Sequence, residues 1–260
     1  GLTSGNQLTS RIGFRGTEDL GGGLKANFWL EAGLNLDNGD GASGYAGAKA
    51  GDGLAFKRQS TVGLEGGFGE VRLGRELTAA YNATARYDVF GSVGIGQSRL
   101  WADGGVLDTG AYDKARTTNQ RVSNAVTYVS PNFSGFKAAV NYGFGEVAGA
   151  NSDRQYFGGG LTYDNGPLSL GLGLERLNED TATNSGKISV WSLGGSYDLG
   201  VAKILAGYRD SKGDRGAAGD DKTKGYMLAV TAPVGPGLVR ASYYRYEYPP
   251  AGAAKLKADQ

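Results

Sequence analysis

Apolar residues recur at every second position in many segments of this chain, and no other sequence feature constrains its fold so strongly. The segment 136–144 reads FKAAVNYGF, and 168–175 reads LSLGLGLE. The segment 24–31, LKANFWLE, repeats the pattern. Successive side chains of a β-strand point to opposite faces of the sheet, so each segment predicts a strand with one apolar face and one polar or small face.

About twelve such segments fit the chain, each roughly ten residues long, which is the length that a tilted membrane-spanning strand needs. The predicted strands lie near 8–17, 24–34, 57–65, 70–77, 119–129, 136–144, 154–164, 167–177, 187–198, 201–210, 222–232 and 237–248. No apolar run approaches the ~18–20 residues of a membrane-spanning helix. The pattern therefore predicts an all-β, antiparallel fold.

The connections between the predicted strands alternate between short and long. Short ones such as 164–166 and 233–237 alternate with longer ones such as 35–56 and 78–118, which are rich in Gly, Asp, Asn and Ser. Short turns on one side and long loops on the other are typical of outer-membrane barrels. A water-soluble sandwich has no reason to separate its loops in this way, so we expect a transmembrane β-barrel.

Composition excludes several classes of function. The chain has 47 Gly but only 6 Pro among 260 residues, which suits many short strands joined by tight turns. It has no Cys and no His, which removes zinc sites with nitrogen or sulfur ligands and every Ser-His or Cys-His catalytic pair. The net charge of +1 implies no basic face for nucleic acid. We therefore expect no catalytic residue, no metal site and no cofactor.

Three tyrosines, Tyr128, Tyr163 and Tyr197, come just before short turns. A ring at this position could lie at the membrane–water boundary with its hydroxyl in water. Tyrosine is also a good strand residue in any sheet. The repeated position beside short turns favours an aromatic girdle.

Two stretches resemble a known family closely. Residues 10–30, SRIGFRGTEDLGGGLKANFWL, and 58–75, RQSTVGLEGGFGEVRLGR, are similar to strand–turn–strand units of Gram-negative general diffusion porins. YVSPNFSGF at 128–136 and YMLAVTAPVGPG at 226–237 look similar to later turns of that family. The resemblance is greatest to its betaproteobacterial, anion-selective members and covers nearly the whole chain.

The resemblance implies a sixteen-stranded barrel in the cell outer membrane, assembled as a homotrimer and surrounded by lipid and lipopolysaccharide. It implies a water-filled channel for small anionic or neutral solutes, with the loop 78–118 folded inward as a constriction. We expect 1–260 to form a single barrel domain that lacks its first strand and its last strands. Open strand edges would be unfavourable in lipid, where each unpaired backbone group costs several kcal/mol of free energy.

Three arginines are candidates for the pore constriction. Arg11 shares a strand face with Arg15, opposite Ile12 and Phe14, so it is expected to point into the lumen. By resemblance, Arg11, Arg58 and Arg121 match the arginines that line the constriction of the anion-selective relatives. Strict alternation instead puts Arg58 on the apolar face, and a bulge or a position above the apolar band would be needed to turn it inward.

Asp88, within the inward-loop motif YDVFGSVGIG at 87–96, is the acidic candidate for the opposite side of the constriction. Asp103, Asp108 and Asp113 are further acidic candidates, although solvation of a surface loop is the better explanation for most of them. Beyond the constriction, four basic residues are expected to line the lumen and steer anions: Arg15, Arg72, Lys137 and Arg209.

Two other classes of function remain to be compared with a porin. One is a barrel enzyme, which would need a Ser-His or Asp-His pair that this sequence does not contain. The other is a non-channel β-barrel or a surface adhesion protein of the outer membrane. The adhesion reading predicts apolar strand faces packed against a second sheet.

Overall fold

The fold was obtained as a computed structural model that describes residues 4–5, 8–42, 53–91, 99–102, 120–145, 155–180, 185–214, 220–248 and 256–259. It is one 14-stranded antiparallel sheet, ordered β1-β2-β4 and then consecutively to β14, with β3 paired to β2. The long strands are β1 (Ser10–Gly21), β2 (Leu24–Leu34), β4 (Gln59–Gly66), β5 (Gly69–Leu77), β6 (Arg121–Val129), β7 (Phe136–Gly143), β8 (Tyr156–Asn165), β9 (Leu168–Asp180), β10 (Ser185–Asp198), β11 (Lys203–Asp214), β12 (Asp220–Val234) and β13 (Gly237–Tyr248). Two short strands, β3 (Gly41–Ala42) and β14 (Leu256–Asp259), complete it.

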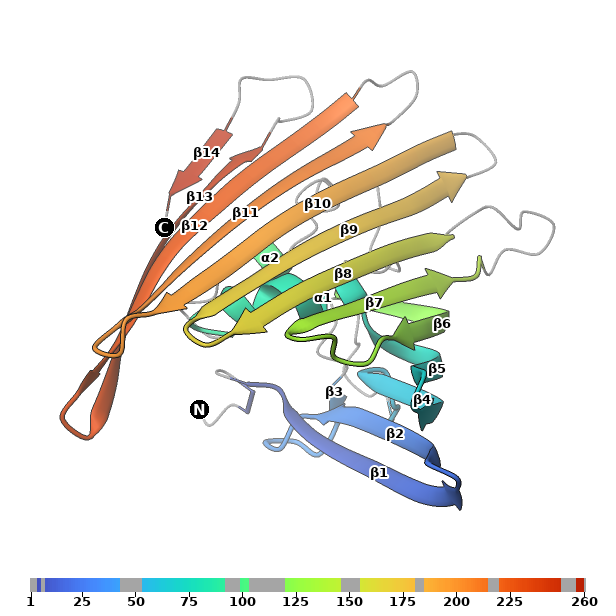
Figure 1. The fold of residues 1–260 in the computed structure, drawn as a ribbon. Helices are drawn as coiled ribbons and strands as arrows, with labels where there is room; N and C mark the ends of the chain where they lie inside the picture. The colour runs from blue at the N-terminus through green and yellow to red at the C-terminus, as the bar shows by residue number, and fades with distance from the viewer. Residues whose placement is uncertain are drawn as a thin grey trace.

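Every long strand falls where alternation predicts one, and the all-β, antiparallel fold is confirmed. Each long strand pairs with the next long strand in sequence, so the sheet grows hairpin by hairpin and curves into a trough (Figure 1). Several strands are longer than expected, β11 reaching Asp214 and β12 beginning at Asp220. These extensions are polar, and apolar alternation alone does not detect them.

The two faces of the sheet have opposite character. On the convex face large apolar side chains are exposed: Phe157 is 53%, Leu174 50% and Leu193 47% exposed. On the concave face, small and polar side chains such as Ser192 and Thr127 are buried. A water-soluble protein does the reverse, whereas a barrel in lipid exposes an apolar band outward.

Aromatic side chains gather beside the short turns. The Tyr128 hydroxyl donates a hydrogen bond to the Phe68 carbonyl oxygen in the β4–β5 turn, with 2.7 Å between the oxygens. The rings of Phe136 and Tyr163 pack with centroids 4.3 Å apart, and Tyr197 is 48% exposed. This arrangement is typical of an aromatic girdle at the membrane boundary.

A segment that follows β5 folds back onto the concave face, and we call it the inward segment. It carries α1 (Ala79–Thr84), the 3₁₀ turn η1 (Ala85–Tyr87) and α2 (Arg99–Ala102) (Figure 1). The Thr78 hydroxyl caps α1 by accepting a hydrogen bond from the Tyr81 backbone N–H at 3.2 Å. The Asn141 side-chain carbonyl of β7 accepts the Ala79 N–H. None of the described helices is long and apolar enough to cross a membrane.

The part of the concave face that lies beneath the inward segment, which we call the wall, is formed by β8–β13. Many of its positions are glycine. On five adjacent strands a Cβ atom would come closer than 3.0 Å to α1, Tyr87, Leu100 or Trp101. These positions are Gly160 on β8, Gly171 on β9, Gly194 on β10, Gly207 on β11 and Gly225 on β12. The helices can therefore approach the sheet backbone directly, and at least these five of the 47 glycines serve this contact.

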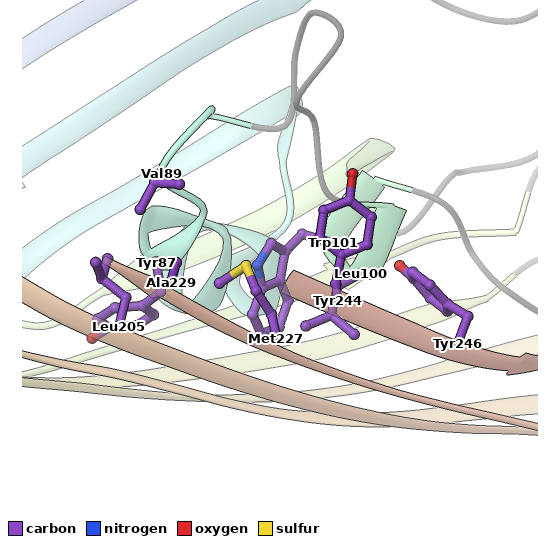
Figure 2. Close-up of a cluster of buried hydrophobic side chains, with 9 residues drawn as sticks. All are labelled: Tyr87, Val89, Leu100, Trp101, Leu205, Met227, Ala229, Tyr244 and Tyr246. Atoms are coloured by element: carbon purple, nitrogen blue, oxygen red, sulfur yellow. The ribbon is translucent and has the colours of Figure 1, made fainter. Parts of the chain in front are cut away.

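Beyond the glycines, apolar side chains hold the segment in place. Figure 2 shows Tyr87, Leu100 and Trp101 of the segment lying against side chains of the wall. The full cluster comprises Tyr87, Val89, Leu100, Trp101, Leu205, Met227, Ala229, Tyr244 and Tyr246. Its three largest segment side chains, Tyr87, Leu100 and Trp101, are at most 1% exposed, so the core of the protein lies inside the trough.

The lipid-facing assignment of the convex side predicts the cost of a charge there. Leu193→Arg, near the middle of β10, is expected to lower the free energy of unfolding by about 2–4 kcal/mol, because a cation at the bilayer midplane loses its hydration. Thr17→Arg, on the concave face, is expected to change it by less than about 1 kcal/mol. Denaturant titration in phospholipid vesicles measures both, and equal costs would contradict the assignment.

Candidate functional site

The arginines expected at the constriction surround one carboxylate, that of Glu31 on β2. Glu31 Oε1 accepts a hydrogen bond from Arg58 Nε at 2.7 Å and lies 3.6 Å from an Arg11 guanidinium nitrogen. The Arg11 side chain is 42% exposed and that of Glu31 14% exposed. The carboxylate therefore orients two guanidinium groups, one of which still faces open space.

Arg121, at the start of β6, joins this group through the backbone. Its Nε donates to the Arg58 carbonyl oxygen at 2.8 Å, and it interacts electrostatically with Arg58, Arg75 and Glu31. Arg75 donates from Nε to the Lys57 carbonyl oxygen at 2.6 Å and from its guanidinium to the Ser123 hydroxyl at 2.6 Å. The structure thus brings Arg11, Arg58 and Arg121 together, with Arg75 beside them.

Arg58 turns inward because it lies outside the strand. β4 begins at Gln59, so the alternation that would put Arg58 on the apolar face does not apply to it. Its backbone N–H donates to the Glu31 carbonyl oxygen at 3.2 Å, which places its side chain beside that of Glu31. We name the four residues Arg11, Glu31, Arg58 and Arg121 the arginine cluster. Three guanidinium groups against one carboxylate give it a net charge of +2.

Asp88 lies in the inward segment just after η1. It is 6% exposed, and its carboxylate accepts a hydrogen bond from the Phe90 backbone N–H at 2.9 Å. Its neighbour Val89 belongs to the apolar cluster against β11, β12 and β13. The other acidic candidates, Asp103, Asp108 and Asp113, and residues 92–96 of the loop motif lie outside the described residues.

The four basic residues expected along the lumen all lie on the concave face, but in different surroundings. Arg15 on β1 and Lys137 on β7 are exposed. Arg72 on β5 is held between two carboxylates, 2.6 Å from Glu70 and 2.7 Å from Glu76. Arg209 on β11 is 7% exposed beneath the inward segment.

Arg209 and Glu175 connect the wall to both helices of the inward segment. Arg209 donates to the Leu100 carbonyl oxygen of α2 at 2.9 Å and lies 3.7 Å from Glu175. Glu175 accepts hydrogen bonds from the Tyr156 hydroxyl at 2.8 Å and from Thr78, the N-cap of α1, at 3.4 Å. Arg209 is therefore a positioning residue. The only sign of its partner in the sequence is a lone glutamate on the small-residue face of β9.

Further polar contacts fix the segment near the short turns. Arg86 binds both carboxylate oxygens of Asp164, at 3.0 and 2.7 Å. The Tyr87 hydroxyl and the Ser169 hydroxyl are 2.9 Å apart. Burial raises the pKa of the Tyr87 hydroxyl above its ordinary value, so this group stays protonated and can donate at neutral pH.

A hollow of about 610 Å³ opens between β1–β5 and the start of the inward segment. Among the residues that line it are Arg15, Trp29, Gln59, Thr61, Arg72 and Asn82. β1, β2 and the start of β4 border this hollow and also carry or adjoin residues of the arginine cluster. The concave face therefore presents a partly open space, lined by polar and apolar side chains, on strands that also carry the arginine cluster.

Comparison with known proteins agrees with this architecture. A family model described as Gram-negative porin matches residues 1–260. The outer membrane porin protein 32 of Delftia acidovorans is 43% identical over 258 residues, covering 95% of this chain and 67% of that protein. An outer membrane porin protein of Bordetella pertussis is 34% identical over 252 residues, covering 90% of this chain and 59% of that protein. The chain thus spans about three fifths to two thirds of these relatives.

Among solved structures, an anion-selective porin from Comamonas acidovorans superposes with a TM-score of 0.81 at 40% sequence identity. The match covers 95% of this chain and 71% of that one. At 40% identity the two proteins are alike in sequence as well as in fold.

The glycine wall yields a prediction about the inward segment. A Cβ at Gly194 would meet the Tyr87 ring, so Gly194→Leu is expected to displace η1 and to cost about 1–3 kcal/mol of unfolding free energy. Trypsin should then cleave after Arg86 faster than in the unchanged protein. At Gly159, on the convex face of β8, a Cβ would meet nothing within 4 Å, so Gly159→Leu is the matched control. Equal cleavage rates for both variants would contradict the seating of Tyr87 on Gly194.

Proposed function

The chain belongs to the Gram-negative porin family of the bacterial outer membrane, and from that premise we propose that it forms a water-filled, anion-favouring channel for small hydrophilic solutes. The observation that carries the proposal is the arginine cluster on the concave face. Its net charge of +2 lies beside the hollow of about 610 Å³, on the face that a closed barrel would turn inward.

The chemistry of the cluster favours anions over cations. Guanidinium groups remain charged at any physiological pH, and their planar arrangement of donors matches carboxylates and phosphates. A narrow passage with low-dielectric walls strengthens the effect of each charge on a passing ion. The relative from Comamonas acidovorans is described as anion-selective, which supports the same leaning here.

We propose that the loop 78–118 narrows the channel and that Asp88 belongs to this constriction. In the same proposal, Arg15, Arg72 and Lys137 line the lumen. The described part of the loop supports this, since α1, η1 and α2 occupy the inside of the trough (Figure 1). We further propose, from the family resemblance, that strands outside 1–260 close a sixteen-stranded barrel. A homotrimer in contact with lipid and lipopolysaccharide is part of the same proposal.

A non-channel barrel or surface adhesion protein is the alternative. It gives no reason for a positively charged group and an open hollow on the concave face, away from the outer surface. An adhesion sandwich would also pack its apolar strand faces against a second sheet, whereas Phe157 and Leu193 are exposed. We propose that the protein is a channel and not an enzyme, because diffusion through a pore requires no catalytic group.

Reversal potential in a planar bilayer tests the function. The native protein in a KCl gradient is expected to give stepwise conductance with a potential that favours chloride. Arg11→Ala and Arg121→Ala should each reduce the ratio of anion to cation permeability about two- to fivefold, because each removes one charge from the net +2 of the arginine cluster. Lys137→Ala removes the same charge from β7, away from the cluster, and should change the ratio less.

The outcomes separate the parts of the proposal. A cation-favouring potential would keep the channel and refute the arginine filter. An equal effect of Lys137→Ala and Arg11→Ala would mean that total lumen charge, not the cluster, sets selectivity. Absence of conductance steps would refute the channel.

A further inference from the structure

One exposed aromatic ring, that of Trp29, lies on the concave face of the sheet and not on the lipid-facing convex face. In the described strands, the other aromatic side chains of comparable exposure, such as Phe14, Phe157 and Trp191, point from the convex face. Trp29 on β2 is 40% exposed and shares the concave face with Glu31. Its indole therefore faces the water-filled side, where a flat apolar surface is available to a solute.

Arg15 lies directly opposite this ring. It is the cross-strand partner of Trp29 in the β1–β2 pairing, which places the two Cβ atoms roughly 4.5–5.5 Å apart. Arg11, Arg58 and Arg72 each bind a glutamate, whereas Arg15 has no carboxylate partner among the described residues. A guanidinium without a carboxylate partner among the described residues thus stands beside an exposed indole.

The hollow gives this pair a defined space. Arg15 and Trp29 both line it, and its volume of about 610 Å³ falls within the range of small-molecule sites, roughly 300–1,000 Å³. Its acidic residues are already engaged: Glu70 accepts hydrogen bonds from Arg72 and Asn27, and Glu76 accepts one from Arg72. Among the charges that line the hollow, Arg15 is therefore the one without an ionic partner in the described part of the chain.

We propose that Arg15 and Trp29 form a binding subsite for aromatic monocarboxylates, in which the guanidinium binds the carboxylate and the indole stacks on the ring. Arg15 is four residues from Arg11 on the same face of β1, about 13 Å along the strand, so the subsite adjoins the arginine cluster. The subsite deepens the proposed function and rests on it for its role in transport. Binding itself can be measured without a channel.

Tryptophan fluorescence of the purified native protein tests the subsite, with 4-nitrobenzoate as a quenching ligand. The chain has 3 Trp, of which Trp101 is 1% exposed and Trp191 lies on the convex face, so the saturable quenching is expected to come from Trp29. Trp29→Phe should abolish the saturable component. Arg15→Gln should weaken binding about tenfold, because a charge-assisted bond to the carboxylate is lost. Lys137→Gln removes the same charge elsewhere on the concave face and should leave binding unchanged.

Uncharged nitrobenzene separates ring stacking from carboxylate recognition, and it should bind the native protein and Arg15→Gln equally weakly. Quenching that does not saturate, or equal weakening by Arg15→Gln and Lys137→Gln, would overturn the proposal. Saturable binding in a protein that gives no conductance would refute the channel and leave the subsite. Conductance without saturable binding would keep the channel and refute the subsite.

Discussion

The structure depends on the close approach of a folded-back segment to a sheet whose facing positions are glycine. Gly160, Gly171 and Gly194 leave room for α1 and Tyr87, and a Cβ at any of them would overlap the segment. Interiors pack to high density, so a single methyl group in such a contact forces a shift of backbone. The glycines on consecutive strands therefore decide where the segment lies inside the trough.

Polar contacts then select one position on that surface. Glu175 and Arg209 hold the N-cap of α1 and a carbonyl of α2, while Arg86 binds Asp164 near the short turns. Asn82 of α1 consequently borders the remaining space together with residues of β1, β2, β4 and β5. The width of that space follows from how the segment is seated, whereas the charge beside it comes from Arg11, Glu31, Arg58 and Arg121 on the sheet.

The sequence predicted the fold more completely than the site. Alternation located all the long strands, because a barrel in lipid must keep one face apolar along each of them. It misassigned the face of Arg58, because alternation holds only within a strand and β4 begins one residue later. Glu31, which pairs with Arg11 and Arg58, was visible only as a polar residue on the lumen face of 24–31, since its partners come from separate segments.

Arg209 illustrates a second limit. Its position on the concave face followed from parity, but its burial under α2 depends on where the inward segment lies. The glycine wall did leave a signal in the sequence. Gly171, Gly194 and Gly207 occupy the polar or small face of three successive strands and are direct partners in the strand register. Gly225, on the same face of the next strand, lies two residues from the position opposite Gly207.

The most direct test of the seated segment is a disulfide between α1 and the wall, in a chain that has no cysteine of its own. The hydroxyls of Thr84 and Ser192 are 3.4 Å apart and both residues are buried, so Thr84→Cys and Ser192→Cys together should form a disulfide on mild oxidation. Single-channel conductance of the double variant should be the same before and after reduction, because the bond only joins groups already in contact. Failure to form the bond, or a conductance that rises on reduction, would contradict the seating of the segment on which the account rests.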